Sequence, residues 1–414
     1  MESQADQSTF RSYLAFFGGQ QFSLLGSSAV QFVIIWWVTI VTEKALVPLY
    51  LTAASIAGFA PMILVTPFAG VLVDRTSRKA LIGVVDFLQA LATVVLILLF
   101  WSGVVSFWHV LAVLAFRSVC QAFHSPAVSA IVPLMVPRDK LSRINGLSYL
   151  LTGMMTLLGP AVAGVLLVFM PVEQVLWVDP ATFAIAIVPL LLIKMPSVRM
   201  PEEKSSFRKD FFEGLSFIKR KRGLLPVVTL ATLLNFLFMP LMVLLPYFVK
   251  YDHFGGVGEL ALLMVVSQGG MFAGGLLMTV MKEVKKKMAV TAVCIVAAYA
   301  TSAMVALTPT GWFWFMAVGL FALDFSVAPA NVLLRTILQV VIPAEMQGRV
   351  NAVLMSLASA ASPFGMILGG TLVGFTGTVN LFLACAASGT LILLIFWFFT
   401  GMRYVEKVEE SVAV

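Results

Sequence analysis

Five side chains set within long apolar runs could do chemistry in this chain: those of Asp86, Arg117, His124, Asp179 and Asp324. An ionisable group at membrane depth costs ~2.5–3.5 kcal/mol on insertion scales, so each should face a protein interior or a water-filled cavity. A buried carboxylate can take up and release a proton, and a histidine titrates near neutral pH. An arginine stays charged and can only hold or tune a carboxylate. These residue types indicate proton movement or buried ion pairing.

Asp324 is the leading candidate for proton coupling. It lies 12 residues into its apolar run, which is ~18 Å of helix and close to the middle of a bilayer. The alternative is a structural ion pair with an arginine, and Arg117 is expected to hold a carboxylate of this kind. Asp179 precedes a proline, which favours a structural capping role. Asp86 is expected to lie near the cytoplasmic end of its helix and to pair with the basic turn beside it, Gly70–Lys79. His124 is expected either to relay protons or to join helices by hydrogen bonds.

A second set of polar or pliable side chains falls on one face of two apolar runs, one in each half of the chain. These candidates for a substrate cavity are Gln20, Ser27, Gln31, Asn235, Met239 and Met242. The first three are spaced seven and four residues apart, which places them on one helical face. Amide, hydroxyl and thioether groups suit a broad, amphipathic ligand. The alternative is that they only hold helices together.

Transmembrane helices must position these side chains. Of the 414 residues, 60% are hydrophobic and 11% are charged, whereas a soluble domain has ~25% charged residues. Lipid is therefore the expected solvent. Runs long enough to cross ~30 Å of hydrocarbon are predicted at Tyr13–Val41, Val47–Val73, Ala80–Trp101, Phe107–Ile131, Asn145–Phe169, Val175–Ile193, Leu224–Val249, Leu260–Met281, Met288–Thr308, Trp312–Val340, Val350–Phe375 and Val379–Met402.

Basic residues fix the expected orientation. With the N-terminus in the cytoplasm, 23 of the 27 Lys and Arg residues fall on the cytoplasmic side, so both termini are predicted to be cytoplasmic. The predicted domains are a six-helix bundle at 1–193, a linker at 194–223 and a second six-helix bundle at 224–414. Within the linker, Phe207–Ile218 has apolar residues at helical spacing and is followed by four charges. An amphipathic helix lying on the inner leaflet is expected there, with a regulatory partner site as the alternative.

The two halves repeat one another. Val136–Asn145 aligns without gaps on Ile342–Asn351, an offset of 206, and Gly159 and Gly164 recur at the same offset. Six-helix halves in one orientation are parallel repeats, and a substrate site is expected between such halves. The predicted fold is all-α, with twelve transmembrane helices in two parallel, pseudo-symmetric six-helix bundles.

A short charged turn, Gly70–Lys79, separates the second and third runs. It resembles the signature of major facilitator superfamily transporters, except that Ser77 stands where the family usually has glycine. The candidate cytoplasmic gate residues are Gly70, Asp74, Arg75, Arg78 and Lys79. We expect Asp74 and its basic neighbours to latch the cytoplasmic ends of the two halves while the site faces outward.

Two further stretches extend the resemblance over the whole chain. Gly159-Pro160-Ala161-Val162-Ala163-Gly164 is similar to the fifth-helix motif typical of exporters, with Met155 at its upstream glycine position. Phe116–Ala127, which includes Arg117, resembles the macrolide-efflux branch, the drug–proton antiporter-3 group. The resemblance implies a multidrug efflux transporter of the cell membrane, coupled to protons by antiport and associated with antibiotic resistance.

The expected partners are membrane lipid, protons and a small amphipathic substrate, with no nucleic acid, and the protein is expected to work as a monomer in the plasma (inner) membrane. No phosphate-binding glycine-rich loop, nucleophile–base pair or metal-binding cluster is visible in the sequence. An enzyme, a cofactor and a metal are therefore not expected. The alternatives are a siderophore or lipid exporter of the same fold, or a non-transporting membrane receptor.

Overall fold

The computed structural model describes residues 7–137, 140–193, 207–221, 223–282 and 284–406, and the elements formed by these residues are helices. The chain divides into two compact units. Unit 1 comprises residues 1–202 together with 256–265, and unit 2 comprises residues 203–255 together with 266–414. Of the predicted linker, residues 194–206 and 222 lie outside the described residues.

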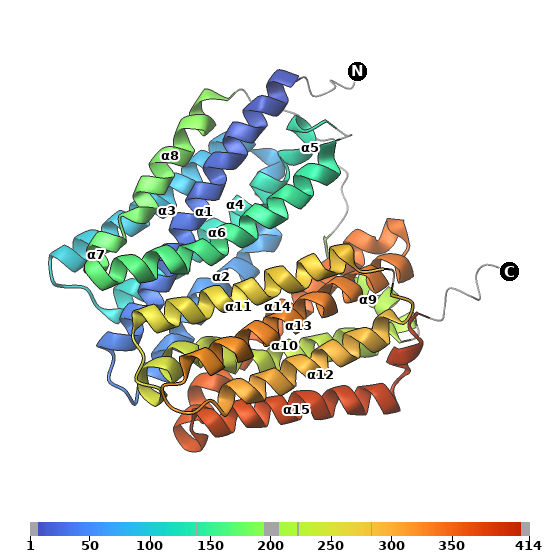
Figure 1. Cartoon of the computed structure of the whole chain (residues 1–414). Helices are drawn as coiled ribbons and strands as arrows, with labels where there is room; N and C mark the ends of the chain where they lie inside the picture. Colours follow the sequence, from blue (N-terminus) through green and yellow to red (C-terminus); the bar gives the residue numbers. More distant parts are fainter. Residues whose placement is uncertain (1–6, 138–139, 194–206, 222, 283, 407–414) are drawn as a thin grey trace. The chain divides into compact units, whose positions relative to one another are not determined.

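Unit 1 consists of six long helices and two short ones (Figure 1). They are α1 (Gln7–Val41), α2 (Val47–Arg75), α3 (Arg78–Trp101), α4 (Phe107–Ser129), α5 (Val132–Met135), α6 (Leu141–Phe169), α7 (Val172–Val175) and α8 (Val178–Leu192). The predicted span Val175–Ile193 is interrupted between α7 and α8. Pro180 falls in the first turn of α8, where its missing N–H leaves no helical hydrogen bond unmade.

Unit 2 contains six further long helices and the shorter α9. They are α9 (Phe207–Arg220), α10 (Leu224–Tyr247), most of α11 (Val257–Val280), α12 (Lys287–Ala306), α13 (Phe313–Val341), α14 (Ala344–Thr376) and α15 (Thr378–Phe399). A π-helical turn, Phe248–Asp252, follows α10, and a 3₁₀ turn, Gly401–Tyr404, follows α15.

The two units pair their helices in the same way. In unit 1, α1 packs against α6 and α8, while α3 packs against α4 and α8. In unit 2, α10 packs against α14 and α15, while α12 packs against α13 and α15. Each helix in the pairs of unit 1 corresponds to the helix six predicted spans later in unit 2, and the corresponding helices form the same pairs. The internal repeat in the sequence is therefore matched by a repeat in helix packing.

Eleven helical segments among the described residues are long and apolar enough to cross a membrane. The twelfth predicted span is α4, which has 23 residues and is therefore long enough, but it carries Arg117 and two histidines, which make it less apolar. Large apolar side chains point outward, as at Phe169 (79% exposed) and Phe399 (84% exposed), while several charged ones are buried. This distribution is the one expected when lipid surrounds the helices.

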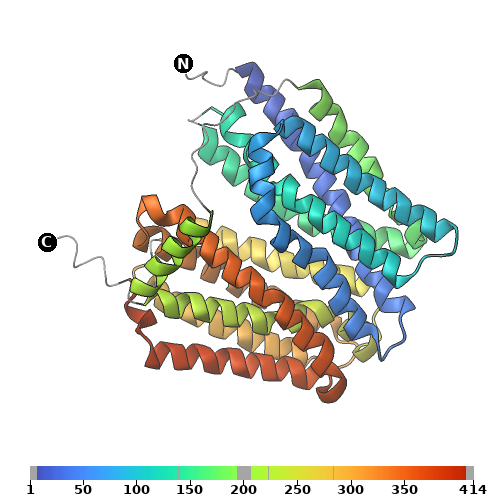
Figure 2. The ribbon, with the colours of Figure 1, turned by 180° about the vertical axis from the view of Figure 1, so that it is seen from behind.

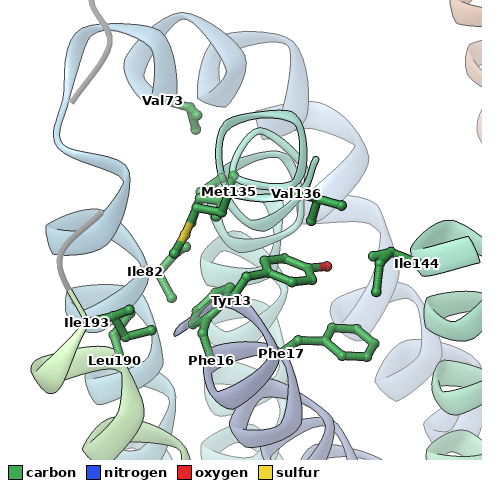
Figure 3. Packing of buried hydrophobic residues seen from close by; sticks show 12 residues of the cluster. Tyr13, Phe16, Phe17, Val73, Ile82, Met135, Val136, Ile144, Leu190 and Ile193 are labelled. Atoms are coloured by element: carbon green, nitrogen blue, oxygen red, sulfur yellow. The ribbon is translucent and has the colours of Figure 1, made fainter. Parts of the chain in front are cut away.

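A hydrophobic cluster closes one end of unit 1 (Figure 3). Tyr13, Phe16 and Phe17 of α1 pack with side chains from α2, α3, α4, α5, α6 and α8. The rings of Tyr13 and Phe17 stack with their centroids 5.8 Å apart. The cluster thereby fixes the ends of the helices that carry the charged candidates of this unit.

The amphipathic helix α9 packs on unit 2. It contacts α14 and α10 and lies across the ends of the long helices, in light green in Figure 2. Ile218 is fully buried, and a Cβ at Gly214 would lie 2.7 Å from the carbonyl oxygen of Arg349. Arg349 Nη1 also lies 2.6 Å from Glu213 Oε2. The prediction placed the apolar face of this helix on lipid, but its buried residues pack on protein, whereas Phe212 is 55% exposed.

Candidate functional site

The interior of unit 1 contains an ion pair between α4 and α8. Arg117 Nη1 lies 2.5 Å from Asp179 Oδ2, and Arg117 Nη2 lies 3.3 Å from Asp179 Oδ1. The residues are 9% and 4% exposed. Two parallel contacts of this kind use the planar guanidinium group, which a lysine could not replace. Asp179 therefore joins two helices, whereas the sequence favoured a capping role for it.

Hydroxyl groups from α1 and α3 form hydrogen bonds with this ion pair. Thr93 Oγ1 donates to Asp179 Oδ2 at 2.6 Å, and Ser27 Oγ donates to Asp179 Oδ1 at 3.3 Å. Arg117 in turn donates to Ser27 Oγ at 3.0 Å and to the carbonyl oxygen of Gln89 at 3.1 Å. Four helices thus meet at one buried pair. Ser27, predicted either to line a substrate cavity or to hold helices together, is hydrogen-bonded within this network.

Asp86 forms a second buried cluster with residues of α1 and α4. Its Oδ2 accepts from Gln20 Nε2 at 3.0 Å, and its Oδ1 lies 3.0 Å from His124 Nε2. His124 Nε2 is also 2.9 Å from Gln20 Oε1. Both of these oxygens accept hydrogen bonds, so Nε2 must carry a hydrogen. The prediction that Asp86 pairs with the basic turn is wrong, and Gln20 is buried in this cluster rather than facing a cavity.

The two clusters form layers inside unit 1. Their members come in pairs seven residues apart on the same helix, namely Gln20 and Ser27 on α1, Asp86 and Thr93 on α3, and Arg117 and His124 on α4. Seven residues are about two helical turns, or ~10.5 Å, and return almost to the same face. The same three helices therefore contribute to both layers, and α8 adds Asp179 to one of them.

Asp324 is the buried charged residue in the described spans of unit 2, with 9% exposure. It lies on α13, and Oδ2 accepts a hydrogen bond from Ser267 Oγ of α11. Among the described residues, Arg117–Asp179 and Arg349–Glu213 are ion pairs, and the His124 imidazole contacts Asp86. Asp324 takes part in none of these contacts. An ion pair with an arginine, the alternative role for Asp324, is absent from the described residues.

A cavity of about 140 Å³ opens between α10, α12 and α13 of unit 2. Asn235, Asn331 and Tyr299 contribute its polar and aromatic groups, and the other lining side chains are mainly apolar. Asn235 Nδ2 donates to the carbonyl oxygen of Ala231 at 2.9 Å. Asn331 was not among the predicted residues. Its sequence signal is the seven-residue spacing from Asp324, which places both on one face of α13.

The remaining predicted cavity residues lie in different surroundings. Gln31 is exposed on α1, while Met239 and Met242 are half-buried on α10. Met239 packs beside α14, where a Cβ at Gly365 would lie 2.9 Å from the Met239 Cβ. Of the predicted set, Asn235 therefore lines the described cavity of unit 2, whereas Met239 contacts a neighbouring helix.

The basic turn binds the ends of neighbouring helices in its own unit. Arg78 Nη1 donates to the carbonyl oxygen of Ala130, just after α4, at 3.1 Å. Lys79 Nζ donates at 2.8 and 2.6 Å to two carbonyl oxygens at the end of α8. Cations are favourable at such helix C-termini. These contacts of Arg78 and Lys79 lie within unit 1, and the predicted latch between the two halves stays a prediction. Of the predicted gate residues, Gly70, Asp74 and Arg75 are those whose surroundings the structure does not describe.

The glycines of the exporter-like motif bring helices into close contact. A Cβ at Gly159 of α6 would lie 2.4 Å from Ser28 Cβ of α1, a distance that side chains do not reach. Its repeat partner Gly365 has the same role, since a Cβ there would lie 2.3 Å from the Phe236 carbonyl oxygen. Pro160 and Gly164 follow in the same helix. Small residues at these positions allow the backbones to approach.

Long apolar helices, duplicated packing and ion pairs buried inside a span define a multi-pass membrane protein. A profile described as Major Facilitator Superfamily matches residues 17–362. The chain belongs to this superfamily, and the fold class predicted from the sequence is confirmed.

Several proteins are similar in sequence to this chain over most of its length. Macrolide efflux protein A of Streptococcus pyogenes is 29% identical over 386 residues, covering 92% of this chain and 94% of the relative. Multidrug efflux pump Tap of Mycolicibacterium fortuitum is 25% identical over 370 residues, covering 86% and 88%. Among solved structures, a bacterial homologue of the iron transporter ferroportin in an inward-facing state aligns with a TM-score of 0.72 at 13% identity, covering 93% of this chain and 98% of that one. The nucleoside transporter NupG aligns with a TM-score of 0.70 at 14% identity, covering 93% and 98%. At these identities the structures show the fold alone.

Proposed function

We propose that this protein is a secondary active transporter that exports amphipathic small molecules, of drug or macrolide type, in exchange for protons. Its likeness, over most of its length, to proteins named for macrolide and multidrug efflux supports export of such compounds. The observation that carries the proton coupling is the environment of Asp324. The transporter would expose its binding site alternately to the two sides of the membrane.

Asp324 differs from the buried carboxylates of unit 1. Asp179 contacts a guanidinium group and Asp86 contacts an imidazole, whereas the described contact of Asp324 is the hydroxyl of Ser267. A buried carboxylate without a cation is costly in its charged form, and a proton neutralises it. Proton uptake from one side and release to the other would couple substrate export to the proton gradient. The paired carboxylates would instead hold the helices of unit 1 in register.

The cavity in unit 2 offers suitable groups for part of such a substrate. The amides of Asn235 and Asn331 supply hydrogen-bond donors and acceptors, and Phe238 and Tyr299 supply aromatic surface. A mixed lining of this kind favours molecules with a large apolar skeleton and a few polar substituents.

The proposed location is the plasma (inner) membrane with both termini in the cytoplasm. Basic residues are concentrated at the starts of α3 and α12, including Arg78, Lys79 and Lys285–Lys287. Basic connections of this kind stay on the cytoplasmic side. The end of α2 and the start of α3 carry our proposed cytoplasmic gate, which consists of Gly70, Asp74, Arg75, Arg78 and Lys79.

Dye uptake into everted membrane vesicles, whose outer surface is the cytoplasmic face, tests the proposal with and without a pH gradient. Asp324→Asn should abolish the gradient-dependent part of export, because the amide cannot carry the exchanged proton. Asp252→Asn, which removes a carboxylate beyond the apolar part of α10, is the matched control and should behave as wild type. Gradient-driven export that survives in the Asp324→Asn protein would contradict the role of Asp324. Wild-type export that ignores the gradient would contradict antiport itself.

A further inference from the structure

A cavity of about 770 Å³ opens at the end of unit 2 where α12 begins and α15 ends. Figure 1 shows these two helix ends on the same side of the unit. The cavity is separate from the cavity around Asn235 and is lined by Lys285, Lys286, Lys287, Met288, Ala289, Ile337, Val340, Val341, Trp397, Arg403, Tyr404 and Glu406. Its volume falls in the range of ligand sites, about 300–1,000 Å³.

The rim of this cavity is strongly basic. It carries three consecutive lysines, 285–287, together with Arg403, and Lys285, Lys286 and Arg403 are exposed. The carboxylate in the lining belongs to Glu406, and its Oε1 accepts a hydrogen bond from the backbone N–H of Met288 at the start of α12. That carboxylate is hydrogen-bonded to a helix N-terminus, so the described residues of the rim carry more positive than negative charge.

The wall of the cavity is apolar. Ile337, Val340 and Val341 of α13 form it together with Trp397 of α15. Val340 is 50% exposed, so the wall continues onto the outer surface of the unit. Trp397 and Tyr404 lie where α15 ends, and aromatic residues at such a level are typical of the membrane–water interface. The site therefore combines cations with an apolar surface open to the outside.

We propose that this cavity binds the phosphate-bearing head group of an anionic membrane lipid, with an acyl chain lying along α13. The exposed cations Lys285, Lys286 and Arg403 match a phosphodiester, and the wall at Val340 matches a hydrocarbon chain. A free phosphate would use the cations but would leave the apolar wall without a partner. The basic residues also lie on the side proposed to be cytoplasmic, where anionic lipids are concentrated.

Lipid binding to the full-length protein in detergent tests this site. Native mass spectrometry counts bound phosphatidylglycerol, with phosphatidylcholine as the neutral comparison, and a titration gives the affinity. Lys285→Gln with Lys286→Gln should weaken phosphatidylglycerol binding about 30-fold, because each basic residue near the surface contributes about 1 kcal/mol. Arg403→Gln should weaken it about fivefold for the same reason. The matched control, Lys219→Gln with Arg220→Gln, removes the same charge from α9 and should leave binding unchanged.

Three results would overturn the proposal. Equal loss of phosphatidylglycerol in the α9 control would show general attraction to basic protein. Displacement of the lipid by inorganic phosphate at matched concentration would assign the site to a free anion. Much tighter lipid binding by a chain ending at Glu406 would show that the acidic residues of 407–414 compete for the cations as the natural occupant.

Discussion

Asp179→Asn should destabilise unit 1 by about 3 kcal/mol. The substitution keeps the size of the side chain but removes the charge opposite Arg117, and it replaces one of the two oxygens that accept at 2.5 and 3.3 Å by an NH₂ group that cannot accept. Removing one partner of a buried pair costs about 3–5 kcal/mol, because the other charge stays buried. Arg117 keeps oxygen contacts from Gln89, Ser27 and Thr93, which places the cost at the lower end of that range.

Thermal unfolding of the purified protein measures this loss. In a unit of about 200 residues, 1 kcal/mol corresponds to roughly 2–4 °C in Tm, so the midpoint should fall by about 6–12 °C. The double variant Arg117→Met with Asp179→Leu replaces both charges by apolar side chains. It should recover most of the loss, since exchange of a whole buried pair for packed apolar groups is often neutral or stabilising.

An unchanged midpoint in the Asp179→Asn protein would refute the reasoning, because it would mean that Arg117 is not left with an uncompensated charge. A double variant that is less stable than the single one would refute it in a different way. That result would show that the polar contacts of Ser27 and Thr93, rather than the charges, hold the four helices together.

Two further predictions concern unit 2. Burial against Phe248, at 4.4 Å between ring centroids, lowers the pKa of His253. The unfolded chain therefore protonates His253 at a higher pH than the folded one, and the free energy of unfolding should fall as the pH drops below ~6.5. In pH-dependent thermal unfolding, His253→Phe should flatten this fall, whereas exposed His109→Gln should not; equal slopes would contradict the assignment. Ile218→Ala should destabilise the packing of α9 on unit 2 by about 2–4 kcal/mol. Glu213→Gln removes a salt bridge to Arg349 whose side chains are 37–40% exposed, and it should destabilise this packing by less than about 1 kcal/mol. Protease sensitivity around residue 207 should therefore rise in the first variant only, and a similar rise in both would contradict apolar packing as the main attachment.

Hydropathy and charge were enough to predict the fold, because they report directly on transfer into lipid. The long helices of the structure coincide with the predicted spans, and the repeated helix pairs agree with the sequence offset between the halves. Helix ends were less predictable. α1 begins at Gln7 and α2 continues to Arg75, since a helix can continue into polar sequence without any hydropathy signal.

The partners of the buried charges could not be predicted from the sequence in the same way. The sequence identified Asp86, Arg117 and Asp179, but pairing depends on which helices are neighbours, and that follows from packing in three dimensions. The apolar face of α9 shows the same limitation. Its pattern predicts burial against something apolar, and only the contacts around Ile218 show that unit 2 covers it. The seven-residue spacings within α1, α3 and α4 can be read from the sequence, but they indicate two polar layers only once these helices are known to be neighbours.

The two polar layers of unit 1 also restrict how this part of the chain can change in length. One residue inserted between Gln20 and Ser27, or between Arg117 and His124, would rotate one layer by about 100° relative to the other and shift it by about 1.5 Å. No rotamer change could restore both sets of hydrogen bonds at once. Divergence in these segments must therefore proceed by exchange of side chains, while insertions and deletions are confined to the loops outside the layers.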